Sequence, residues 1–158
     1  MRRADQWLGL AALAALPACA APDPSVDPAA ARNEVVAALD RYQVAARAVD
    51  PDAIAGFFTA TGTLFEPGIT PIRGRDSIRA FIGSFPGVQV HTATATPDTI
   101  EVYGGTAYLW GSYYEHLAFP GQPESEQSGR FVMQWVRQPD GAWLIERHFR
   151  VPLPAGPP

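Results

Sequence analysis

The chain has 158 residues, 47% of them hydrophobic and 11% aromatic, which suffices for one buried core and leaves no room for a second domain. Its formal net charge is −4 and it has no run of basic residues, which excludes the phosphate-neutralising surface that nucleic-acid binding needs. All 12 positively charged side chains are arginines, so mechanisms through a lysine Schiff base or a P-loop lysine are excluded too.

Residues 1–18 have the pattern of a secretory signal peptide: a basic start, then an apolar run too short to span a bilayer. The end of this segment, Leu-Pro-Ala-Cys, resembles the lipobox of bacterial lipoproteins, whose cysteine is lipidated and becomes the first residue of the mature chain. The resemblance predicts a periplasmic or outer-membrane-anchored lipoprotein held by a lipid on Cys19. Ordinary cleavage after Ala20 is the alternative, and it would discard the only cysteine.

The composition divides the rest of the chain into three parts. Residues 19–29 are rich in proline and small side chains and should form a disordered tether. Residues 30–152 form the folded domain, and residues 153–158 are a proline-rich tail that we also expect to be disordered. A single domain therefore carries any function.

Two Asp-Pro pairs mark helix starts, because an aspartate caps a helix and proline fits its first turn. The first pair opens a helix from Pro28 to about Val49. The second opens a short helix that continues through Phe58, and Gly62 ends the helical region. A third helix is predicted over residues 77–84.

Strands follow the helices. A short strand is predicted at residues 63–66, and the pattern then changes to strands over residues 88–96, 99–103, 106–119, 129–137 and 143–151, with a polar loop at 120–127. Helices first and strands afterwards predict an α+β fold, with the helices packed on one face of a curved, mainly antiparallel sheet of four to five strands.

Alternation along the last strand places Leu144, Glu146, His148 and Arg150 on one face, and Trp143, Ile145, Arg147 and Phe149 on the other. The face of the preceding strand depends on the hairpin loop. A four-residue loop, 138–141, places Phe131, Met133 and Trp135 beside Glu146 and His148, whereas a three-residue loop with a bulged glycine places Val132, Gln134 and Val136 there.

Several short motifs together resemble the SnoaL-like and ketosteroid-isomerase-like proteins of the nuclear transport factor 2 fold. They occur in the family's order and spacing over roughly residues 30–151: Tyr42, Asp52-Ala53-Ile54, Phe57-Phe58, Leu64-Phe65-Glu66-Pro67, Gly74-Arg75-Asp76-Ser77-Ile78 and Phe81, with residues 141–148 as the last strand. The resemblance implies a cone-shaped fold with three N-terminal helices on the concave face of the sheet, and it favours the four-residue hairpin loop. It leaves function open, since the superfamily includes isomerases, cyclases, dehydratases, epoxide hydrolases and members without known activity.

The same resemblance suggests site residues. Glu66 matches the catalytic base of ketosteroid isomerases and Tyr42 their oxyanion-stabilising tyrosine, with His148 as a third catalytic candidate. Met133 stands where the second oxyanion donor would be, and methionine cannot donate, which argues against steroid isomerisation. The predicted pocket lining is Phe57, Phe65, Tyr108, Trp110, Tyr114, His116, Met133 and Glu146.

Each candidate has a structural alternative. Glu66 can cap a turn or pair with Arg73 or Arg75, and Tyr42 can be a core tyrosine. His116 and His148, with Glu146 or Glu115, do not form a dense ligand motif, so the sequence predicts no metal and no cofactor. His91 is expected at an exposed strand position.

Two functions remain open. The first is binding of a small apolar molecule in a hydrophobic pocket, which the missing second donor favours. The second is an isomerase- or lyase-type enzyme that uses Glu66 as base and Tyr42 as hydrogen-bond donor. In either case the outer sheet face is expected to form a homodimer through Val132, Val136, Trp143, Ile145 and Phe149.

Overall fold

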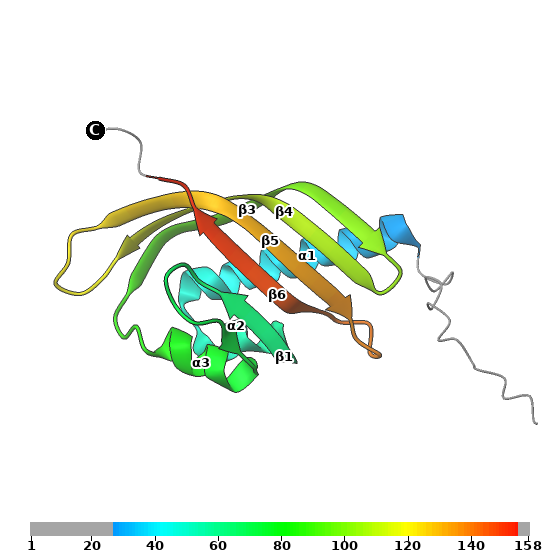
Figure 1. Cartoon of the computed structure of the whole chain (residues 1–158), viewed down its shortest axis with the longest axis horizontal. Helices are drawn as coiled ribbons and strands as arrows, with labels where there is room; N and C mark the ends of the chain where they lie inside the picture. Colours follow the sequence, from blue (N-terminus) through cyan, green and yellow to red (C-terminus); the bar gives the residue numbers. More distant parts are fainter. Residues whose placement is uncertain (1–26, 155–158) are drawn as a thin grey trace, which may run out of the picture.

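A computed structural model describes residues 27–154 as one curved sheet with three helices on its concave side (Figure 1). The helices are α1 (Pro28–Ala48), α2 (Pro51–Gly56) and α3 (Arg75–Gly83). The strands are β1 (Phe58–Phe65), β2 (Ile72–Arg73), β3 (Gln89–Tyr103), β4 (Thr106–Ala118), β5 (Ser125–Arg137) and β6 (Trp143–Pro152). The predicted signal peptide, Cys19 and residues 155–158 lie outside the described part.

The sheet order is β2-β1-β6-β5-β4-β3, and all neighbours are antiparallel except β1 and β6, which are parallel. In Figure 1, α1 runs beneath the long strands, while α2 and α3 lie together beside β1. The predicted α+β class is confirmed. The described sheet has six strands instead of four to five, because the two-residue strand β2, which was not predicted, pairs with β1.

Aspartates cap the first two helices, as predicted. Asp27 accepts a hydrogen bond from the amide of Ala29 at 3.0 Å. At the start of α2, Asp50 accepts hydrogen bonds from the amides of Asp52 and Ala53. Val49 has a left-handed backbone (φ 50°), which turns the chain sharply between α1 and α2. The first helix confirms the prediction to within one residue at its end, but it begins at Pro28, inside the predicted tether.

The boundary between α2 and β1 differs from the prediction. The second helix ends at Gly56, and β1 begins at Phe58, because the amide of Ile145 in β6 donates to the carbonyl of Phe57 at 2.7 Å and draws the chain into the sheet. Gly62 lies inside this strand and does not end a helix. A side chain there would come within 2.9 Å of the Ile145 carbonyl, so glycine permits the close approach of β1 to β6.

The long strands are also more continuous than predicted. The two predicted strands before Gly104 are one strand, β3, with an irregularity at Pro97. The predicted loop is shorter, since β5 begins at Ser125. Gly111 in β4 has no room for a side chain, because a Cβ would overlap the carbonyl of Thr96 in β3. The strands β3 and β4 therefore approach closely at this point, and Figure 1 shows that both strands are curved.

The core lies between α1 and one end of the concave face. It is formed by apolar side chains that are almost completely buried: Val35, Leu39, Leu109, Met133, Trp135 and Ile145. None of the helices described between residues 27 and 154 has the length and apolar character needed to cross a membrane.

Candidate functional site

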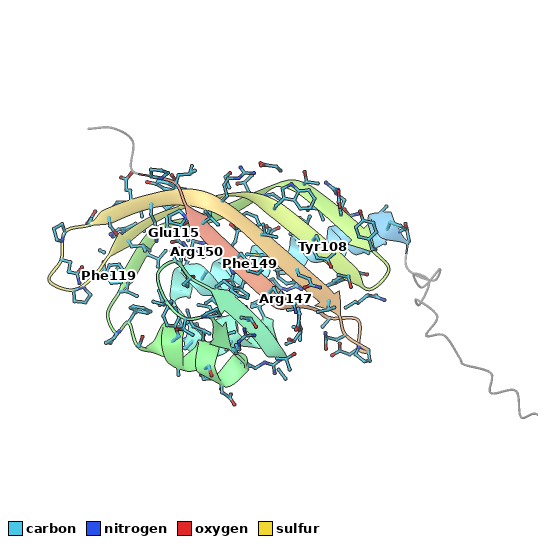
Figure 2. The ribbon with its side chains drawn as sticks, in the orientation of Figure 1. Tyr108, Glu115, Phe119, Arg147, Phe149 and Arg150 are labelled. Atoms are coloured by element: carbon cyan, nitrogen blue, oxygen red, sulfur yellow. The ribbon has the colours of Figure 1, made fainter. Side chains whose placement is uncertain are left out.

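A cavity of about 220 Å³ occupies the other end of the concave face. Apolar side chains from the three helices, from β1, β3 and β4, and from adjoining loops form most of its wall: Ala46, Val49, Ile54, Leu64, Phe81, Ile82, Phe85, Val88, Val90, Leu117 and Phe119. Five polar side chains complete the lining: Tyr42, Glu66, Glu115, Gln127 and Arg150. Figure 2 shows Glu115 and Arg150 close together, with Phe119 near the edge of the molecule.

Arg150 joins two carboxylates in this wall. Its Nη1 lies 3.3 Å from Glu66 Oε1, and its Nη2 lies 2.5 Å from Glu115 Oε2. All three side chains are at most 20% exposed, so water screens the cluster only weakly. Gln127 also donates to Glu115, at 2.7 Å. The cavity therefore contains one fixed cation between two carboxylates.

Gly129 in β5 makes this cluster possible. Strand β5 separates β4, which carries Glu115, from β6, which carries Arg150. A side chain at position 129 would overlap the ring of Tyr113, and Arg150 lies over the same ring, 4.4 Å from its centre. Because Gly129 has no side chain, the ring of Tyr113 can lie over it. Arg150 then crosses this ring to reach Glu115.

Burial governs the charge of Glu66. Burial raises its pKa above the ordinary value, Arg150 partly offsets this, and the nearby carboxylate of Glu115 raises it further. For Arg150, burial acts to lower the pKa, but the carboxylates of Glu115 and Glu66 outweigh it, so the guanidinium stays charged. Burial therefore favours the neutral form of Glu66 more than water would.

Tyr42 contacts His148 deeper in the fold, with 3.4 Å between the hydroxyl and Nδ1. Burial, with a smaller contribution from the positive charge of Arg150, lowers the pKa of His148 to about 3, so the imidazole is neutral at physiological pH. Burial raises the pKa of Tyr42, which keeps its hydroxyl protonated. The hydroxyl can therefore donate to His148 or to a bound molecule.

A smaller space of about 60 Å³ adjoins this pair. It shares Tyr42, Glu115 and Arg150 with the main cavity and is otherwise lined by residues that include Met133 and His148. The structure thus brings Glu66, Tyr42, His148 and Met133 to one concave surface. Phe57 lies behind this surface and packs edge-on against Tyr42, with 5.7 Å between ring centres.

The predicted face of β4 is wrong. The side chains that turn toward the helices are Ala107, Leu109, Gly111, Tyr113 and Glu115, which are buried or half-buried. Tyr108, Trp110, Tyr114 and His116 therefore lie on the convex face and not in the pocket. Phe65 is there too, stacked on Phe149 with 3.9 Å between ring centres.

Glu146 explains a second error. The pairing of β5 with β6 skips this residue, which forms a β-bulge and accepts a hydrogen bond from Thr59 at 2.6 Å instead of facing the pocket. The bulge reverses the alternation, so Trp143 and Ile145 lie in the core on the same side as His148. Met133 does lie opposite His148, as the four-residue loop predicted, but the observed loop has five residues, 138–142, and the bulge corrects the register.

Two site residues, Arg150 and Glu115, were missed as parts of the pocket. The sequence did place Arg150 on the face of His148, and Glu115 was considered only as a metal ligand. The available signal was a charged residue at an inward position of an otherwise apolar strand, which usually requires a partner. Their pairing crosses β5 and links residues 35 positions apart, so sequence spacing does not show it.

A curved sheet that encloses an apolar cavity against N-terminal helices defines the nuclear transport factor 2-like fold. A sequence model of the SnoaL-like domain matches residues 27–148, and the chain belongs to this family. No curated protein matches the chain significantly.

Solved structures agree with this fold. A ketosteroid isomerase-like protein from Erwinia carotovora atroseptica has a TM-score of 0.70 and 16% identity, over 78% of this chain and 96% of that one. A nuclear transport factor 2-like superfamily protein from Salmonella enterica has a TM-score of 0.69 and 19% identity, over 82% and 95%. A Mycobacterium tuberculosis protein of unknown function has a TM-score of 0.67 and 25% identity, over 79% and 77%.

Proposed function

We propose that the protein binds a small, mainly apolar and neutral molecule in the cavity beside Arg150. The observation that carries this proposal is the cavity wall, which is apolar except for one cluster of an arginine and two carboxylates. The volume, about 220 Å³, is below the range usual for drug-sized ligands, so the ligand is small. With both carboxylates ionised the cluster carries a net negative charge, which disfavours an anion and favours a hydroxyl or carbonyl group.

Matched probes test this proposal. Cyclohexylmethanol and cyclohexanecarboxylate have similar shapes and differ in charge. We expect the alcohol to raise the unfolding temperature and the carboxylate to have no effect at neutral pH. Leu117→Trp, which fills the cavity, should abolish the alcohol's effect, whereas Ser128→Trp on the convex face should leave it unchanged. Equal stabilisation of parent and Leu117→Trp protein would contradict binding in this cavity.

A second candidate is proton-transfer catalysis of the isomerase or lyase type. It is supported by the presence of Glu66, with its raised pKa, and the protonated Tyr42 in the same cavity. Glu66 would accept the proton and Tyr42 would donate a hydrogen bond to the oxygen on which charge develops. Because Met133 supplies no second donor, the substrate would be more acidic than a simple ketone. Once a ligand is found, Glu66→Gln and Tyr42→Phe should each slow its turnover, and unchanged turnover in both would exclude this mechanism.

We also propose a homodimer through the convex face. Val132 is 43% exposed there and pairs with Trp110 on one side and Phe149 on the other. Trp143 and Ile145 are withdrawn from the predicted interface because they are buried in the core. Light scattering should give twice the chain mass, and Val132→Glu should give a monomer. A monomeric parent at micromolar concentration would contradict this proposal.

The N-terminal pattern supports a further proposal, that a lipid on Cys19 holds the protein at the periplasmic side of a membrane. Mass spectrometry of the mature N-terminus tests it. A diacylglyceryl modification on Cys19 is expected, and an unmodified terminus at Ala20 or Ala21 would exclude the anchor.

A further inference from the structure

Three potential metal ligands meet on the convex side of the sheet. His91 belongs to β3, His116 to β4, and Glu124 directly precedes β5. The Nε2 of His116 lies 2.8 Å from Glu124 Oε2, and the Nε2 of His91 lies 3.5 Å from Glu124 Oε1. One donor atom from each of the three side chains lies within 4.8 Å of the other two.

A bulge in β3 brings the two histidines together. The pairing of β3 with β4 passes from Val90 opposite Leu117 to Thr92 opposite His116 and skips His91. Both imidazoles therefore lie beside each other, with 4.8 Å between ring centres. Regular pairing would give one residue opposite another, whereas here two residues of β3 share one position of β4.

The spacing suits a tetrahedral ion. Zinc bonds of about 2.0–2.1 Å to nitrogen and oxygen place two ligand atoms about 3.3 Å apart. The distances from the histidines to Glu124, 2.8 Å from His116 to Oε2 and 3.5 Å from His91 to Oε1, are on either side of this value, and the three donor atoms lie within 4.8 Å of one another. The Glu124 side chain is 60% exposed, so a small rotation of it would bring these two distances closer to each other.

We propose that His91, His116 and Glu124 form a binding site for a divalent transition-metal ion of the zinc class. Two imidazoles and one carboxylate are a ligand set that zinc accepts, and the exposure of the three side chains leaves a coordination position for water. His116 and His148 were the histidines that the sequence analysis weighed as metal ligands, but His148 lies on the concave face and cannot share an ion with His116.

The site lies behind the edge of the cavity. Val90 and Leu117, the neighbours of the two histidines in sequence, line the cavity on the other face of the sheet. Glu124 closes the loop that begins after β4 and contains Phe119, another lining residue. A bound ion therefore connects β3, β4 and this loop, and it fixes the strand ends that form the cavity edge. The proposal does not depend on the identity of the cavity ligand.

Histidine NMR with zinc tests the site directly, because the chain has only 3 histidines and the third is buried on the opposite face. Zinc chloride is added to the purified, untagged protein after chelator treatment. We expect the ring signals of His91 and His116 to shift and saturate at one zinc per chain, while those of His148 stay in place. Absence of a shift at 100 micromolar zinc, or a shift of His148 alone, would overturn the proposal.

Calorimetry on variants provides the second measurement. His91→Ala, His116→Ala and Glu124→Gln should each weaken zinc binding at least about tenfold, since each removes one ligand. Glu101→Gln is the matched control, because Glu101 is a carboxylate elsewhere on β3 that contacts Tyr103, and it should bind zinc as the parent does. Unchanged affinity in a His91→Ala/His116→Ala protein would show that zinc binds elsewhere and would overturn the assignment.

Discussion

The same long strands form both ends of the concave sheet face, but different elements cover the two ends. At one end α1 covers the strands, and Leu109, Met133 and Trp135 are at most 1% exposed. At the other end α1 has already finished, and Leu117, Val90 and Phe119 surround a cavity. The difference shows that the position of the helix C-terminus decides where apolar side chains form core and where they form a binding surface.

The largest effect should come from an apolar truncation at the covered end. Leu109→Ala leaves a hole that rigid neighbours cannot fill, and it should lower the free energy of unfolding by about 3–5 kcal/mol. Leu117→Ala removes the same atoms from the wall of an existing cavity and should cost less than about 1.5 kcal/mol. Urea denaturation of both variants measures the contrast. Equal losses would show that the two ends do not differ in packing.

Removal of the arginine tests the polar part of the open end. Arg150→Met leaves two poorly solvated carboxylates without a cation, and it should lower the free energy of unfolding by about 2–3 kcal/mol at pH 7. Adding Glu66→Gln should recover part of this loss, because only one carboxylate then remains. Arg147→Met is the control, since Arg147 is exposed on the convex side and donates to Gln134; its effect should stay within about 0.5 kcal/mol. If Arg147→Met is as destabilising as Arg150→Met, the loss does not come from the contacts of Arg150 with the two carboxylates.

The smallest effect concerns pH and the boundary between the two ends, where His148 lies. Its pKa is lowered in the folded state to about 3, below the ordinary value of 6.5, so the unfolded chain binds more protons between these values. Stability from this group is complete above pH 6.5 and is lost as the pH falls, by about 1–2 kcal/mol at pH 5. Glu66, with its raised pKa, opposes this trend. Urea midpoints at pH 7.5 and 5 should show a smaller difference in His148→Asn, and an unchanged difference would contradict the role of His148.

Local signals in the sequence were sufficient for the helix starts and for part of the site. Asp27 and Asp50 act through amides two or three residues away, so their role is visible in the sequence. Glu66 and Tyr42 were placed by family resemblance, and both do line the cavity. The biochemical roles of these two residues are still predictions.

Features that depend on long-range pairing were not predictable. In β4, Tyr108, Trp110 and Tyr114 alternate with Leu109 and Tyr113, so both faces have an apolar pattern and alternation cannot select the inner one. Glu146 gives no sign that it is skipped in the ladder. The bond from Thr59 that holds it there joins residues 87 positions apart.

The bulge at Glu146 has a consequence for insertions and deletions. Without this one residue, the two halves of β6 would follow a single alternation. That alternation places Trp143, Ile145, His148 and Arg150 on the concave face together. If Glu146 instead took a paired position opposite β5, either Trp143 and Ile145 would leave the core, or His148 and Arg150 would leave the concave face. A relative that lacks this residue can therefore build both surfaces from the same side chains, whereas one that pairs it with β5 must build one of them from different side chains.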